Sequence, residues 1–244
     1  MSFDPQIAKL TVDLCRIAYR TEDAVHSALS DLGMADIAFY SGFSTQAFTA
    51  SVGETSYLAF RGSEAVADWL ANAKFLPSDR EGGVRIHSGF LVALDEVWDD
   101  IVAHLAGAPK LVVTGHSLGA ALAIIAAWRL AQAGIPIEAV YSFGQPRTGH
   151  RDFRTSYDAL LGEVTFRVIN HVDLVTRVAL LIQGYRHVGR RMYFDHEAKF
   201  HHDAGAWQIT KDDVRYRLKH FGRIDSIGIA PHLIGSYRTV VDRL

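Results

Sequence analysis

Residues 112–119 read Val-Val-Thr-Gly-His-Ser-Leu-Gly and place Ser117 between two glycines. An apolar run with strand character, 110–114, precedes this motif, and an alanine-rich run with helical character, 118–133, follows it. Gly-x-Ser-x-Gly between a strand and a helix is typical of a nucleophile elbow, a turn so sharp that the neighbours of the serine must be small. The turn holds the serine hydroxyl at the carboxyl end of a sheet. We therefore expect Ser117 to be a nucleophile, rather than an idle serine in a glycine-rich turn.

The alternation of predicted elements indicates one α/β domain over residues 1–244. The first thirty residues show the pattern of one or two amphipathic helices. Apolar, strand-like runs are expected at 37–41, 46–52, 56–60, 137–143 and 164–169. Helices are expected at 90–105, 153–161 and from about residue 232. Buried strands that alternate with helices predict a mostly parallel central sheet with helices on both faces.

The composition is that of an ordinary globular chain and excludes several function classes. The 244 residues are 49% hydrophobic and 21% charged, with a formal net charge of −2 that argues against nucleic acid as a partner. No apolar run is long enough for a transmembrane segment. Cys15 is the single cysteine, which excludes an intrachain disulfide and a cysteine-ligated zinc. The single cysteine and a start without signal-peptide character favour a cytoplasmic protein; secretion is the alternative if a leader was removed.

A serine nucleophile needs a histidine base and a carboxylate that orients the base, and after an elbow the acid precedes the histidine in the chain. Asp173 follows the strand predicted at 164–169, where the acid belongs. Its alternative role is to cap a short helical turn, since aspartate is a good N-cap.

Later histidines are candidates for the base: His187, His196, His201, His202, His220 and His232. Three of them lie in the polar stretch 195–203, which is expected to be a solvated loop. His220 follows a charged helix. His187 lies in a strand-like run, whereas His232 precedes the last helix and is free to reach across the sheet edge. The residues therefore favour His232 over His187.

Two further features concern anions and metals. The backbone N–H of Leu118 follows the nucleophile and is expected to form half of an oxyanion hole. Ser63, which follows the end of the strand at 56–60, is the candidate second donor; it can also cap the next helix. The spacing between His196 and His201 is not that of a helical metal-ligand pair, so no metal site is expected.

The order of these and other motifs resembles the fungal-type triacylglycerol lipases, class 3 of the α/β-hydrolases. The resemblance extends from about Tyr57 to the C-terminus. It rests on Ala59-Phe60-Arg61-Gly62-Ser63, Asp68-Trp69-Leu70, His87-Ser88-Gly89-Phe90, Gly115-His116-Ser117-Leu118-Gly119, Tyr141-Ser142-Phe143-Gly144-Gln145-Pro146-Arg147 and Asn170-His171-Val172-Asp173-Leu174-Val175. It implies an α/β-hydrolase fold in which Ser63 serves the oxyanion hole, Asp173 is the acid and His232 is the base.

The resemblance also implies a lid-like helix at about 64–75, with Val66, Trp69 and Leu70 on its apolar underside. Charged residues interrupt this segment, so only modest activation at a lipid surface is expected. Arg190-Arg191 departs from the family pattern, which has an acid and aromatic residues there. The absence of disulfides departs from the secreted fungal members.

The implied function is that of a serine ester hydrolase, a lipase or esterase that cleaves acylglycerols or similar short- to medium-chain esters through an acyl-enzyme. It needs no cofactor, and its partners would be the ester substrate and, transiently, a lipid–water interface. The same residues would serve a phospholipase, a thioesterase or an acyltransferase, which the fold does not separate. A non-catalytic binding protein on a lipase fold is the alternative from another class.

Overall fold

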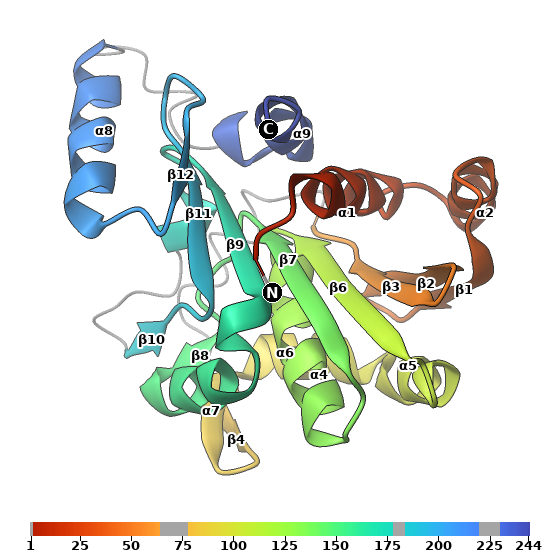
Figure 1. Ribbon diagram of the computed structural model, residues 1–244. Coiled ribbons are helices and arrows are strands. Elements are labelled where there is room, and N and C mark those ends of the chain that lie inside the picture. The colour runs from red at the N-terminus through yellow and green to blue at the C-terminus, as the bar shows by residue number, and fades with distance from the viewer. Residues whose placement is uncertain (1, 64–77, 178–183, 220–229) are drawn as a thin grey trace.

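The computed structural model describes residues 2–63, 78–177, 184–219 and 230–244, which share one central sheet (Figure 1). The sheet has eight strands in the order β1-β2-β3-β6-β7-β9-β11-β12. Neighbours from β3 to β11 are parallel, and the outer pairs are antiparallel. The strand bounds are β1 Ala35–Ser41, β2 Gln46–Val52, β3 Thr55–Phe60, β6 Lys110–His116, β7 Ile137–Phe143, β9 Thr165–Asn170, β11 Arg190–Phe194 and β12 Phe200–His202. This confirms the mostly parallel sheet expected from the sequence.

Helices cover both faces of the sheet, as Figure 1 shows. One face is covered by α1 Pro5–Ile17, α2 Glu22–Asp31 and α9 Ile234–Val241. The other carries α4 Ser88–Asp95, α5 Trp98–Leu105, α6 Leu118–Gln132 and α7 Arg151–Leu161. A further helix, α8 Ala206–Lys219, lies beside the β11–β12 edge (Figure 1). None of the helices in these described ranges combines the length and hydrophobicity needed to cross a membrane.

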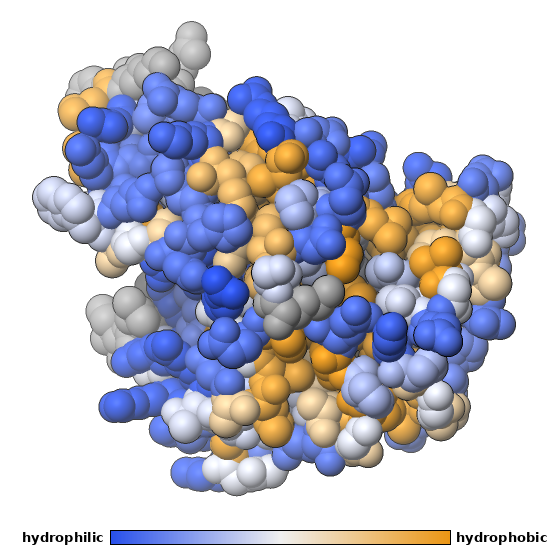
Figure 2. Space-filling model, viewed as in Figure 1, coloured by the Kyte–Doolittle hydropathy of each residue, from blue (hydrophilic) through white to orange (hydrophobic). Residues whose placement is uncertain are grey.

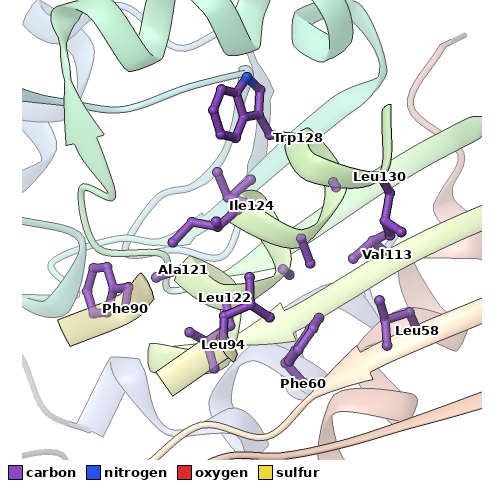
Figure 3. Close-up of a cluster of buried hydrophobic side chains, with 14 of the residues drawn as sticks. Leu58, Phe60, Phe90, Leu94, Val113, Ala121, Leu122, Ile124, Trp128 and Leu130 are labelled. Carbon is purple, nitrogen blue, oxygen red and sulfur yellow. The ribbon is translucent and has the colours of Figure 1, made fainter. Parts of the chain in front are cut away.

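The central strands divide their side chains between two hydrophobic cores. Along β6, Val113 packs into the core under α6, whereas Val112 packs into the core under α1 and α9. Both side chains are almost completely buried, so the strand reads as a continuous apolar run. Helix α6 is equally apolar because its sides face α4 and α7 as well as the sheet. Figure 3 shows Leu122, Ile124 and Trp128 of this helix within the first core.

The structure corrects the single helix expected over 90–105, which is divided into α4 and α5. The carboxylate of Glu96, at the end of α4, accepts hydrogen bonds from the backbone N–H groups of Ser44 (2.7 Å) and Thr45 (3.1 Å). The Thr45 hydroxyl donates to the carbonyl of Ala93. The turn between β1 and β2 therefore supplies partners for the end of α4, a long-range contact that periodicity does not reveal.

Two other expectations are modified. The polar stretch 195–203 forms a hairpin with β11 rather than a loop, because β12 pairs with β11. The Asp195 carboxylate accepts hydrogen bonds from the backbone N–H groups of Glu197 and Lys199 across the turn.

A second sheet, which the sequence did not indicate, has the order β10-β8-β5-β4. Its strands are β4 Ser78–Glu81, β5 Val84–His87, β8 Gly149–His150 and β10 Tyr185–Arg186, all too short for a clear pattern. On the face seen in Figure 2, hydrophilic residues predominate where β11 and β10 lie.

We expect Trp128→Ala to lower the free energy of unfolding by about 3–5 kcal/mol, because it leaves a cavity in the core under α6. The Trp128 side chain is 1% exposed, packs edge-on against Phe153, and donates its indole N–H to the hydroxyl of Ser156. Ser156→Ala is the matched control, since it removes only that hydrogen bond and should lower the free energy of unfolding by about 1 kcal/mol. Urea denaturation measures both. Equal losses in the two variants would mean that packing of the indole is not the dominant contribution.

Candidate active site

Ser117 occupies a strained turn between β6 and α6. Its backbone has φ 59° and ψ −125°, in a region that residues with a side chain rarely adopt. A Cβ atom at Gly115 would lie 2.2 Å from the carbonyl oxygen of Gly119, so the turn can close only with glycine at that position. The Ser117 N–H donates to the carbonyl of Phe143, which ties the turn to β7. The local sequence thus enforces the sharp bend that the motif predicts.

The carboxylate of Asp173 lies just past β9 and is fully buried. One oxygen accepts the backbone N–H of Val175 (2.8 Å), the first residue of the 3-10 turn Val175–Arg177. The other oxygen bonds to Nδ1 of His232 (2.9 Å) and to the hydroxyl of Tyr237 (2.5 Å). Both roles considered from the sequence therefore coexist: Asp173 caps a turn and holds a histidine.

His232 comes from the far end of the chain, in the 3-10 turn Ala230–His232 just before α9. Its ring stacks on the ring of His116 with centroids 4.7 Å apart, and His116 is the residue before Ser117. Nδ1 is occupied by Asp173, whereas Nε2 of His232 and Oγ of Ser117 are buried and have no hydrogen-bond partner among the described residues. A ring nitrogen and a hydroxyl that are both open are compatible with proton transfer between them.

Gly144 is the close neighbour that lets this histidine take its place. A Cβ atom there would lie 2.8 Å from two ring atoms of His232 and 3.0 Å from the carboxylate of Asp173, and the residue has φ 61°. Any side chain would therefore push the acid and the histidine apart.

His116 supports the site in a way that the sequence did not indicate. Its Nε2–H donates to the carbonyl of His232 (2.7 Å), so its Nδ1 is the acceptor for the hydroxyl of Tyr19 (2.8 Å). Burial, and secondarily the nearby His232, hold the pKa of His116 well below its usual value, so the ring is neutral. The position of His116 beside Ser117 was a possible signal, whereas nothing in the sequence marks Tyr19 or Tyr237.

The end of β3 lies against the elbow and brings the candidate oxyanion donors near the nucleophile. A Cβ atom at Gly62 would be 3.2 Å from Cβ of Ser117. The next residue, Ser63, lines a cavity of about 330 Å³ together with Arg61 and the β1–β2 turn. Leu118 begins α6, where backbone N–H groups and the helix dipole favour a negative charge. Val66, Trp69 and Leu70, which the sequence predicts to belong to a lid, lie outside the described residues.

The remaining histidines are held elsewhere. His187, the other candidate base, bonds through Nε2 to the carbonyl of Thr176 (2.8 Å). His196 bonds to Asp212, and His201 bonds to Asp195. His220 lies outside the described residues. Within the described parts of the chain, no group of three or more histidine, cysteine or acidic side chains is arranged to hold a metal ion.

Known lipases are similar to this chain in sequence and in fold. The Lipase (class 3) family matches residues 57–182. A secreted mono- and diacylglycerol lipase from Fusarium solani is 36% identical over 146 residues, which are 57% of this chain and 43% of that protein. A rice chloroplastic/mitochondrial phospholipase A1 is 32% identical over 172 residues, 57% of this chain and 39% of its own. These curated relatives are thus matched over less than half of their length.

The fold matches solved structures over more of the chain. A structure described among fungal lipases with an unusual buried polar cluster superposes with a TM-score of 0.70 at 25% identity. The superposition covers 82% of this chain and 85% of the other.

The neutral His116 predicts how stability depends on pH. A native pKa below the unfolded value of about 6.5 means that the unfolded chain binds the additional proton, so the free energy of unfolding should fall as the pH drops below that value. The contribution of one such histidine is at most about 1.4 kcal/mol per pH unit. His116→Gln should flatten the loss between pH 6.5 and 5, whereas His104→Gln, at an exposed residue of α5, should leave it unchanged. Urea denaturation at several pH values measures the slope, and a wild-type slope in His116→Gln would contradict a neutral, buried His116.

Proposed function

Because this chain belongs to the class 3 lipase family, we propose that it is a serine hydrolase of carboxylic esters, with acylglycerols as the main substrate class. The observation that carries the proposal is the buried bond between Asp173 and His232, next to the strained elbow of Ser117. A binding protein that had lost catalysis would have no need to keep the nucleophile in a strained conformation, or a base nitrogen buried without a partner.

The proposed reaction proceeds through an acyl-enzyme. Nε2 of His232 accepts the proton of Ser117 as Oγ attacks the ester carbonyl, and the imidazolium that forms is stabilised by Asp173. The backbone N–H groups of Leu118 and Ser63 receive the developing oxyanion. His232 then gives its proton to the leaving alcohol. Water, deprotonated by the same histidine, releases the acid and restores Ser117, so these residues complete the cycle without a cofactor.

Asp173 is suited to stabilise the imidazolium of His232 because the position of its carboxylate is fixed before substrate arrives. Three donors, the amide of Val175, the ring of His232 and the hydroxyl of Tyr237, hold its two oxygens. The carboxylate therefore need not reorganise when the imidazolium forms, which is the basis of electrostatic preorganisation.

For the substrate, we infer short- and medium-chain acylglycerols or related esters. The Fusarium relative is named for mono- and diacylglycerols, which supports this class. The segment 64–75, with Val66, Trp69 and Leu70, is proposed as a lid over the acyl site, in a single domain. Its charges at Glu64, Asp68 and Lys74 reduce the apolar surface exposed on opening, so activation at a lipid surface should be modest.

A phospholipase is the second candidate, because the rice relative is named a phospholipase A1 and would use the same serine, acid and histidine.

The names of the relatives also bear on the cellular location of this protein. The Fusarium relative is a secreted protein, which supports the secreted alternative over the cytoplasmic location that the single cysteine suggested.

Ser117→Ala should reduce kcat for ester hydrolysis by on the order of a millionfold, because it removes the nucleophile. Folding should be preserved, since only a hydroxyl without a hydrogen-bond partner among the described residues is lost. Release of fatty acid from tributyrin and from phosphatidylcholine emulsions measures the activity and separates the two candidate substrates. Ser156→Ala is the control for a serine outside the site and should retain activity. Hydrolysis at the wild-type rate in a purified Ser117→Ala protein would refute the assignment.

Substitution of the two candidate bases should give opposite results. His232→Gln should lower kcat by about 10⁴-fold or more, because no other group can take the serine proton. His187→Gln can keep a donor for the carbonyl of Thr176 and should retain most of the activity. The comparison uses hydrolysis of p-nitrophenyl butyrate by both variants. Loss of activity in His187→Gln, with His232→Gln still active, would place the base at the other histidine.

A further inference from the structure

A cavity of about 430 Å³ lies where β9 and β11 meet α7 and β10. Six arginines line it: Arg147, Arg154, Arg167, Arg186, Arg190 and Arg191. Among the described residues of its lining, Asp203 is the single acid. So strong an excess of one sign of charge around one cavity creates a positive potential that attracts anions.

Two of the arginines at the cavity have carboxylate partners. Arg154 pairs with Asp158 (3.1 Å), and Arg190 pairs with Asp203 (2.9 Å). Arg191 donates to the backbone carbonyl of Ala204, which carries no compensating charge. The described lining of the cavity therefore combines six arginines with one acid, Asp203.

Arg167 is the exceptional member of the group. Arg167 arises from β9 within the sheet and is 3% exposed, yet its Nε–H is buried without a hydrogen-bond partner among the described residues. Arg191 is its register partner on the neighbouring parallel strand, so two like charges stand side by side. A buried charge that is neither paired nor hydrogen-bonded is strongly unfavourable.

The environment lowers the pKa of Arg167 without neutralising it. Burial, followed by the charges of Arg191 and Arg147, brings the pKa to about 9. The guanidinium is therefore protonated at neutral pH. An anion bound in the arginine-lined cavity would compensate the buried positive charge of Arg167.

We propose that this cavity is a binding site for a phosphate group, either inorganic phosphate or a small phosphomonoester, with Arg167 as its innermost contact. Guanidinium forks match phosphate oxygens in bidentate geometry. A carboxylate presents two oxygens in one plane, which one arginine can satisfy. A phosphate presents its oxygens in several directions and carries up to two negative charges, which suits arginines that converge from several elements. The depth of Arg167 excludes contact with a flat membrane surface, so the ligand is a soluble anion.

Binding is measured by isothermal titration calorimetry and by thermal unfolding with inorganic phosphate, glycerol 3-phosphate or acetate, in sodium chloride of matched ionic strength. We expect phosphate to bind and to raise the unfolding temperature, with acetate at least about tenfold weaker. Tighter binding of glycerol 3-phosphate than of phosphate would identify a monoester site, and the reverse would identify a site for the free anion. Equal effects of phosphate, acetate and chloride would overturn the proposal.

Arg167→Met removes the charge and keeps the length of the side chain. It should weaken phosphate binding at least about tenfold, and in phosphate-free buffer its unfolding temperature should equal or exceed that of the wild type, because no uncompensated charge remains. Arg16→Met, at an exposed residue of α1, is the matched control and should bind phosphate as the wild type does. Unchanged phosphate affinity in Arg167→Met would contradict the site.

Asp203→Asn gives an independent test that does not alter the buried core. Asp203 is exposed and has φ 48°, a conformation that asparagine adopts readily, so the variant should fold. Loss of the acid frees Arg190 and raises the positive charge of the cavity, so phosphate should bind severalfold more tightly. Equal or weaker binding would contradict the proposal.

Discussion

The close approach of β3, β6 and α6 at the elbow is the constraint on which the rest of the site depends. A Cβ atom at Gly119 would lie 2.4 Å from the carbonyl oxygen of Phe60, so the first turn of α6 contacts the end of β3 directly. The end of β3 also brings Gly62 next to Ser117, since a Cβ atom at Gly62 would be 3.2 Å from Cβ of Ser117. The strain persists because the surrounding sheet and helix are buried and closely packed. The proposed nucleophile and the proposed oxyanion donors thus lie in segments that pack directly against each other.

A chain of buried hydrogen bonds then joins distant parts of the sequence around that elbow. Tyr19 bonds to His116, His116 to the carbonyl of His232, the ring of His232 to Asp173, and Tyr237 to the same carboxylate. The network connects the segment after α1 with β6, β9 and α9. Buried polar groups are costly unless satisfied, so such a network restricts the site to one arrangement. The two atoms of the proposed proton transfer are the exception, since Oγ of Ser117 and Nε2 of His232 have no partner within the described residues.

Buried charges are compensated differently along β9. At its carboxyl end the negative charge of Asp173 is surrounded by donors, including a histidine that becomes positive during the proposed reaction. In the middle of the same strand, Arg167 is buried beside other arginines without an acid. The charge of Asp173 is compensated by donors from the chain itself, whereas the charge of Arg167 has no acid beside it among the described residues. That contrast is the basis for proposing a ligand at the arginine cavity and catalysis by the protein's own residues at Asp173.

The sequence by itself determined the α/β fold, most strands and the elbow, because these follow from local patterns. The strand expected at 46–52 has the same bounds as β2. The Gly-x-Ser-x-Gly motif predicts the sharp turn at Ser117. The sequence also placed Asp173 after its strand as the candidate acid, and it favoured His232 over His187 as the candidate base because His232 precedes the last helix. Only the tertiary structure shows that the ring of His232 reaches Asp173, across 59 residues of chain, which supports His232 as the proposed base. The second sheet, the break between α4 and α5, the roles of Tyr19 and Tyr237, and the convergence of the arginines were likewise decided there. Each depends on contacts between residues far apart in sequence, and these leave no periodic signal.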